Sequence, residues 1–253
     1  MLFHSQQGEF HCYIEFFCLK NNKVGLFCLG AAYACGMKKI SFFVLFVLVL
    51  SVLALSACSG ALGKYEKSVS EYRDNVYVGS SSGFTAEAVS GYREAPFEID
   101  GKSGSKADFC LVTITPASYD PTKEYTYSVT LNGVEYTGDF VKHPFENTYS
   151  FEVAARCVDN TLTVTVDGEN IELASVKTEQ YITPEKAFEI ALKRLGSTQI
   201  VKNGKYEIYI RLIANPINAA GGYFWYVAFV DESQETVAVL IHPENMEITA
   251  VRE

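Results

Sequence analysis

The stretch that decides the fold reads Ser128-Val-Thr-Leu-Asn-Gly-Val-Glu-Tyr-Thr137. Apolar and polar residues alternate on both sides of Asn132-Gly133, as they do in strands that bury one face. Asn-Gly is the strongest short hairpin signal, because both central residues of a type I′ turn need a positive φ. The stretch therefore predicts two antiparallel strands joined by a tight turn.

Similar signals continue outward from this hairpin. Asp159-Asn160 and Asp167-Gly168 mark turns on either side of an alternating strand, Thr161–Val166, and Ala107–Thr115 alternates as well. About six to eight short strands with regularly spaced turns are typical of a sandwich. We therefore expect an all-β sandwich domain over residues 84–177, with Gly91–Gly101 as a connection that crosses between its sheets.

The pattern changes after Tyr181. Thr183 is suited to cap a helix, Pro184 to its first position and Glu185 to its first turn. The helix should end near Gly196, with one apolar face: Ala187, Phe188, Ala191, Leu192 and Leu195. Strands are expected next, at Tyr206–Ile213, Tyr223–Val230, Thr236–His242 and Met246–Val251. This order predicts a small α+β domain, a helix on an antiparallel sheet, over residues 178–253.

The segment Ile182-Thr-Pro-Glu-Lys-Ala-Phe-Glu-Ile-Ala-Leu192 resembles the helix that opens PepSY domains. The resemblance covers about residues 179–253. The usual Asp-x-x-Thr-Gly-Glu turn before the last strand is replaced here by His242-Pro-Glu-Asn-Met-Glu247. The resemblance implies a non-catalytic domain that restrains proteases or binds partners in the bacterial envelope.

A second stretch indicates where the chain works. Met37-Lys-Lys precedes an uncharged, mostly apolar run from Ile40 to Ala57, which has the layout of a secretory signal. Its end, Leu55-Ser-Ala-Cys58, resembles the lipobox of bacterial lipoproteins, which implies that Cys58 receives a diacylglyceryl group and becomes the first mature residue. An uncleaved membrane anchor is the alternative. Both interpretations place the rest of the chain outside the cytoplasm, anchored to the bacterial cell membrane.

The segments that flank this signal peptide (residues 37–57) are less regular. A lipoprotein signal begins at its own methionine, so we expect translation to start at Met37 and interpret residues 1–36 as an upstream leader that results from a start site assigned too early. An extended n-region is the alternative. Residues 58–83 read as the lipidated N-terminus and a tether. This tether holds a short helix over residues 59–74 and a flexible joint at Gly79–Gly83.

Charge and motifs narrow the function. The formal net charge of −9 disfavours nucleic acid as a partner. Partners are expected to be the lipid bilayer, reached through Cys58, and an envelope or secreted protein. No catalytic, phosphate-binding, cofactor-binding or metal-ligand motif appears, and His143 and His242 both precede a proline at a turn. We therefore expect a non-enzymatic binding protein without cofactor, metal or catalytic residues.

Three sets of residues are candidate sites. Cys110 and Cys157 are expected in strands and could form a disulfide outside the cytoplasm, or remain buried free thiols. Tyr223, Trp225 and Phe229 share one face of a strand that is apolar on both faces, so they are either a binding face or core. A second hypothesis is a lipoprotein that binds cell wall or a small ligand, with stacking groups for sugars supplied by Tyr92, Tyr119, Tyr125 and Tyr127.

The signal layout makes lipidation testable. We expect Cys58→Ser to abolish incorporation of labelled fatty acid and to release the protein from the membrane fraction, because the thiol that receives the lipid is removed. Cys28→Ser is the control and should be labelled like the native chain. Equal labelling of all three proteins would show that Cys58 is not the lipid attachment site.

Overall fold

The computed structural model describes residues 16–17, 29–30, 61–216, 218 and 221–253. The chain forms two compact units, Met1–Cys58 and Ser59–Glu253. The described residues of the first unit form an antiparallel pair, β1 (Phe16–Phe17) with β2 (Leu29–Gly30). The apolar signal segment and Cys58 lie outside the described residues. Their roles therefore stay predictions.

The second unit is mostly β. Its helices are α2 (Ala61–Tyr65), the 3-10 turn η1 (Glu66–Ser68), α3 (Pro184–Leu195) and α4 (Gln199–Asn203). Its strands, in chain order, are β3 (Val69–Ser80), β4 (Phe84–Glu94), β5 (Lys106–Pro116), β6 (Thr126–Leu131), β7 (Val134–Asp139), β8 (Val141–Lys142), β9 (Tyr149–Val153), β10 (Thr161–Val166), β11 (Glu169–Ser175), β12 (Glu207–Ala214), β13 (Tyr223–Val230), β14 (Thr236–Ile241) and β15 (Ile248–Arg252). Among the described residues, these thirteen strands belong to one sheet.

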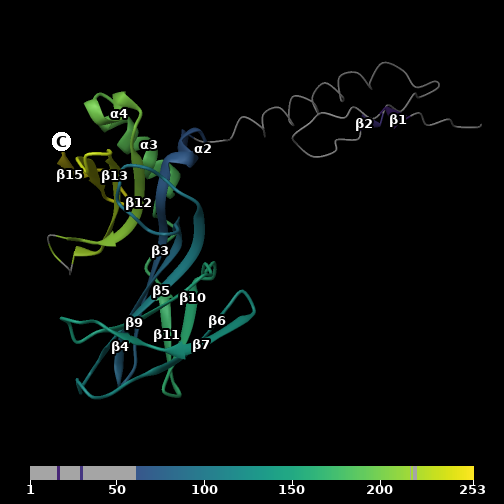
Figure 1. The fold of residues 1–253 in the computed structure, drawn as a ribbon, viewed down its shortest axis with the longest axis vertical. Helices are drawn as coiled ribbons and strands as arrows, with labels where there is room; N and C mark the ends of the chain where they lie inside the picture. The colour runs from purple at the N-terminus through teal and green to yellow at the C-terminus, as the bar shows by residue number, and fades with distance from the viewer. Residues whose placement is uncertain (1–15, 18–28, 31–60, 217, 219–220) are drawn as a thin grey trace, which may run out of the picture. The chain divides into compact units, whose positions relative to one another are not determined.

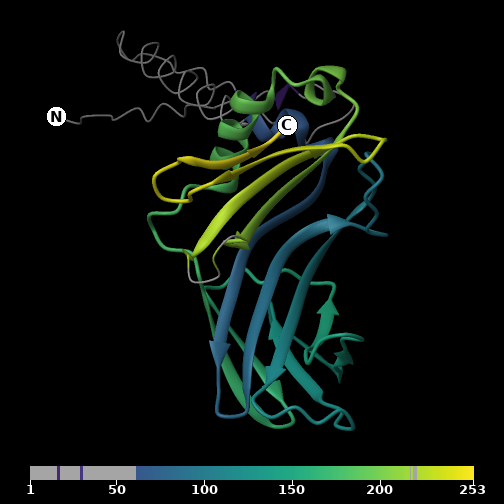
Figure 2. The same ribbon diagram turned by 90° about the vertical axis from the view of Figure 1, so that its left-hand side faces the viewer.

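Strand β3 holds the sheet together. On one edge it pairs with β4, from Glu71↔Arg93 to Ser80↔Thr85. Its other edge is divided: the first half pairs with β12 in parallel, and the far end pairs with β11 through Val78 and Tyr77. The long strands β3 and β4 therefore run from the helical end of the second unit into its other end (Figures 1 and 2).

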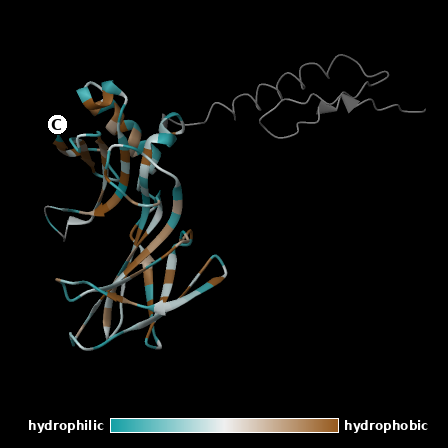
Figure 3. Ribbon diagram, viewed as in Figure 1, coloured by the Kyte–Doolittle hydropathy of each residue, from teal (hydrophilic) through white to brown (hydrophobic). Residues whose placement is uncertain are grey.

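The strands from β3 to β11 nearly close into a barrel. One path from β3 runs through β4, β5, β9 and β8, and the other runs through β11, β10, β6 and β7. Only Phe140 separates β7 from β8 along the chain. Apolar and polar residues alternate along the strands (Figure 3), and the inward side chains form one core, which includes Tyr77, Val112, Ile114, Val164 and Leu173.

At the other end, α3 covers one face of the sheet β12–β15. Thr183 caps α3 by accepting the backbone N–H of Lys186 through its side chain, as the sequence predicted. The Tyr72 hydroxyl donates to Glu185 Oε1 over 2.7 Å and joins β3 to the first turn of α3. A second core lies between helix and sheet, and includes Phe188, Leu195, Ile210, Trp225 and Phe229.

The predicted hairpin turns are confirmed. Asn132 and Gly133 have φ values of 53° and 78° and join β6 to β7. Asp167 and Gly168, at 47° and 87°, join β10 to β11. These turns need positive φ at both central positions, so local chemistry alone determines them.

The expectation of a sandwich followed by a separate PepSY-like α+β domain is wrong. The expected helix and C-terminal strands form, but β12 continues the sheet into β3, so the two halves share one β-sheet. Residues 69–80, predicted as tether and joint, form this central strand. A register shift between Arg73 and Asn75 breaks its alternation, and that break conceals the strand in the sequence.

The segment Gly91–Gly101 also differs from expectation. Its first residues belong to β4, and residues 95–105 join β4 to the neighbouring strand β5, so they do not cross between sheets. This 95–105 connection covers part of the sheet instead. Phe97 packs edge-on against Tyr209 of β12, and Gln234 donates its side-chain N–H to the Ile99 carbonyl.

A buried ion-pair cluster lies at the junction of β3 and β12. Glu71 is fully buried, and its carboxylate accepts hydrogen bonds from Arg73 and Arg211. Both arginine side chains remain partly exposed. The cluster links the parallel pair at the point where the two halves of the sheet meet.

Removing this carboxylate should destabilise the fold. We expect Glu71→Ala to lower the free energy of unfolding by about 3 kcal/mol, because two guanidinium groups would lose their counter-charge while partly buried. Urea denaturation measures the effect. Glu152→Ala, which removes a more exposed pair with Arg93, should cost less than about 1 kcal/mol. Similar losses in both variants would show that the buried cluster does not hold the junction.

Candidate functional site

The barrel wall opens between β6 and β10. Their ladder comprises Tyr127↔Val166, Ser128↔Thr165 and Val129↔Val164, although both strands continue past it, to Leu131 and Thr161. Each strand is fully paired on its other side, β6 with β7 and β10 with β11. The two strands therefore separate towards this end without losing their outer partners.

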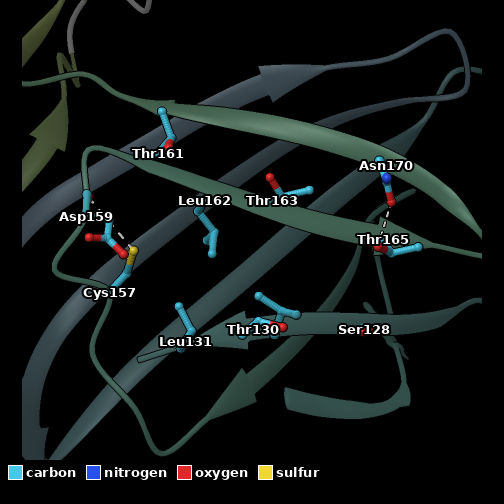
Figure 4. A pocket seen from close by; sticks show the side chains of 11 residues that line it. Ser128, Thr130, Leu131, Cys157, Asp159, Thr161, Leu162, Thr163, Thr165 and Asn170 are labelled. Carbon is cyan, nitrogen blue, oxygen red and sulfur yellow. Dashed lines mark hydrogen bonds between the residues drawn. The ribbon is translucent and has the colours of Figure 1, made fainter. Parts of the chain in front are cut away.

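The opening contains a groove of about 340 Å³ (Figure 4). Its buried members are Val129, Leu131, Leu162 and Cys157, which belong to the barrel core. Its exposed or half-exposed members are mainly hydroxyl and amide side chains: Ser128, Thr130, Thr161, Thr163, Thr165 and Asn170. We call this site the β6–β10 groove.

The chemistry of the groove is mostly uncharged. Asp159 is its one acidic lining residue, and the Asp159 carbonyl is held by the Tyr77 hydroxyl at 2.9 Å. Thr165 donates its hydroxyl hydrogen to Asn170 Oδ1 over 2.7 Å, and this pair stands at one end of the groove (Figure 4). Hydroxyl groups both donate and accept hydrogen bonds. The groove is therefore suited to a neutral ligand that is rich in hydroxyl or amide groups.

Cys110 and Cys157 are both buried free thiols, so the structure contains no disulfide between them. They are neighbours in the barrel core: Ser90 pairs with Cys110 across β4 and β5, and the Ser90 hydroxyl oxygen accepts the Cys157 N–H over 2.8 Å. Burial raises the pKa of Cys110 to about 12, and Cys157 adds to the effect. Cys157 lines the β6–β10 groove from below, whereas Cys110 does not line it.

The aromatic face on β13 lies in the core. Trp225 and Phe229 are fully buried in the core under α3, and Tyr223 is half-buried at its edge. The Trp225 indole N–H donates to the Ile182 carbonyl over 3.1 Å. Of the two alternatives that the sequence left open, the structure matches core packing. The opposite face of β13 contributes Ala228 and Val230 to a small cluster that includes Phe97 of the 95–105 connection.

The four tyrosines considered for sugar stacking do not form one surface. Tyr92 stacks on Tyr72 at 4.9 Å, and Tyr125 is buried in the barrel. Tyr127 stacks on Phe151 at 3.6 Å. Tyr119 is exposed, beside Lys142. Stacking by a tyrosine platform is therefore not available in this arrangement.

His143 and His242 both stabilise turns. Nδ1 of His143 accepts backbone N–H groups of Phe145 and Glu146, and Nδ1 of His242 accepts those of Glu244 and Asn245. Within the part of the chain that the structure describes, no group of three or more His, Cys, Asp or Glu side chains is arranged to hold a metal ion.

Sequence reasoning missed the β6–β10 groove. The alternating hydroxyls of Ser128–Thr130 and Thr161–Thr165 were visible as the polar faces of two strands. Their approach, and the point where the ladder stops, depend on pairing between residues that lie 35 to 39 positions apart along the chain. No local signal encodes that point.

No protein-family model, curated protein sequence or solved structure matches this chain. None of the helices in the described ranges is long and apolar enough to span a membrane.

The burial of the two thiols can be tested by measuring how their alkylation depends on pH. We expect iodoacetamide to leave Cys110 unmodified in the folded protein between about pH 7 and 10, because the thiolate is the reactive form and the pKa is raised to about 12. An exposed thiol, with a pKa of about 8.5, would react increasingly over this range. Peptide mass spectrometry after unfolding should find Cys110 and Cys157 both alkylated.

A cysteine introduced at the exposed position next to Cys157, by Val158→Cys, is the control and should react readily in the folded protein. Recovery of a disulfide-linked peptide pair that contains Cys110 and Cys157 would contradict the free-thiol arrangement.

Proposed function

We propose that this chain is a lipid-anchored extracytoplasmic protein that binds a small neutral ligand, a cell-wall saccharide, in the β6–β10 groove. The observation that carries the proposal is the early end of the β6–β10 ladder, which opens a groove lined by hydroxyl and amide groups above an apolar floor. The signal-like stretch ending at Cys58 supports the location. The proposed role is binding rather than catalysis.

The groove matches a saccharide in three respects. Its volume of about 340 Å³ lies in the range of small-ligand sites. The hydroxyls of Thr130 and Thr163 stand on the two separating strands, so one ligand can bridge them. Leu131 and Leu162 supply apolar surface below, which suits the C–H faces of a sugar ring.

A protein partner is the second candidate function. The observation that favours it is the β8–β9 hairpin, where Phe145 is 92% exposed and Val141 is 69% exposed. Val141 lies on β8 and Phe145 in the turn after it, and exposed apolar patches are typical of contact sites. The His143 side chain holds the backbone of this turn, so Phe145 is presented on an ordered loop. Restraint of a protease is not carried forward, because it rested on a separate PepSY-like domain.

Saccharide binding is tested by isothermal titration calorimetry, in which N-acetylglucosamine oligomers are added to the purified full chain in detergent. We expect saturable binding, weakened about two- to tenfold by Thr163→Val, because the substitution keeps the shape of the side chain and removes a hydroxyl hydrogen bond. Thr130→Val should act similarly.

Thr115→Val on β5, outside the groove, is the matched control and should bind like the native protein. Equal affinity of all variants would place the saccharide elsewhere. The absence of saturable binding to the native chain would reject the saccharide as ligand.

A further inference from the structure

A separate polar region lies under the 95–105 connection, where the start of β3, the end of β4 and the start of β12 meet. Gly101 donates its backbone N–H to Glu207 Oε1 at 3.0 Å, and Gly104 donates to Glu94 Oε2 at 2.7 Å. Between them, Ser103 donates its hydroxyl hydrogen to the Val69 carbonyl. Because these donors lie within four consecutive residues, both carboxylates belong to one small region.

This region concentrates unpartnered oxygen atoms. In the described part of the chain, five buried side-chain polar atoms have no hydrogen-bond partner, and four of them are here: Ser70 Oγ, Glu94 Oε1, Glu207 Oε2 and the Tyr209 hydroxyl. The four side chains are each at most 3% exposed. Ser70 lies at the register shift between the pairs Val69↔Ile208 and Glu71↔Tyr209, which brings it beside Tyr209. The Tyr209 hydroxyl lies beside the Glu207 carboxylate, and a group of buried oxygens of this kind calls for a water or an ion.

The charges in the region are not balanced by the cations nearby. Burial raises the pKa of Glu94, backbone hydrogen bonds from Gly104 and Glu98 lower it, and the charges of Glu207 and Asp100 raise it. Arg211, the nearest arginine on β12, is already paired with Glu71. The Lys106 ammonium donates to the Glu66 carbonyl. Lys106 also attracts Glu94, but one ammonium group leaves the second of two buried carboxylates without a counter-charge. A bound cation would therefore be favourable there.

We propose that this region is a calcium site, in which Glu94 Oε1 and Glu207 Oε2 bind Ca²⁺ and the hydroxyls of Ser70 and Tyr209 supply neutral oxygens. An all-oxygen set of donors selects a hard cation. Calcium accepts six to eight oxygens in flexible geometry, whereas magnesium requires a near-ideal octahedron. Two carboxylates balance the charge of Ca²⁺, and water would complete its shell.

Binding there would fix the 95–105 connection on the sheet. The free carboxylate oxygens would hold the ion, while the other two already hold Gly101 and Gly104. The connection covers the face of the sheet opposite α3, where Phe97 packs on Tyr209. Calcium would therefore stabilise the cover of this second face, independently of the β6–β10 groove.

The test uses the full chain after treatment with a chelator, titrated with CaCl₂ alone. We expect a saturable rise in melting temperature, and Tb³⁺ luminescence sensitised by Tyr209 that Ca²⁺ displaces. Glu207→Gln keeps an oxygen for the Gly101 N–H but removes a charge, so it should weaken the apparent Kd about tenfold or more. Glu87→Gln, a carboxylate on β4 outside the region, is the matched control and should match the native protein.

Three results would overturn the proposal: no saturable response of the native chain to Ca²⁺, an unchanged Kd in Glu207→Gln, or an equal response to Mg²⁺ or Na⁺. If Glu207→Gln does not fold, Tyr209→Phe replaces it, since it retains the ring that packs on Phe97. Weaker calcium binding by Tyr209→Phe supports the site, and unchanged binding refutes it.

Discussion

Strand β3 gives one edge to β4 and divides the other between β12 and β11, and this division is the constraint on which the rest of the structure depends. Two residues five positions apart on β3 serve different cores. Tyr72 donates to Glu185 in the first turn of α3, whereas Tyr77 lies in the barrel and donates to the Asp159 carbonyl. The register shift near Arg73 lets one strand present suitable side chains to both.

The same division explains the charged residues at the junction. Glu71 lies where β12 and β3 run in parallel, and its two arginine partners come from one strand each. A buried carboxylate that is bonded to two guanidinium groups fixes the pairing register of β3 with β12. Apolar side chains alone would define this register less strictly. The carboxylates of Glu94 and Glu207, by contrast, hold backbone N–H groups of a loop, which places charge under the 95–105 connection.

The β6–β10 groove follows from competition between pairings. The Asn132-Gly133 turn commits β6 to β7 and the Asp167-Gly168 turn commits β10 to β11, over the full length of each strand. The contact between the two hairpins is then free to stop early, after three pairs. The opening exposes hydroxyls outside and leaves Leu131, Leu162 and Cys157 beneath, so a site arises at a seam between two locally determined units.

The sequence by itself determined the features that short-range chemistry controls. The positive-φ turns, the capped helix α3 and most of the strand positions follow from residues within a few places of each other. The tertiary structure decided what depends on distant partners: that residues 69–80 form the central strand, that Trp225 and Phe229 face α3, and where the β6–β10 ladder ends. The physical reason is that strand pairing and burial join segments that are far apart in the chain. The residues around Glu71 do not indicate which arginines will pair with it, and the apolar sequence of β13 does not indicate which element will cover each of its faces.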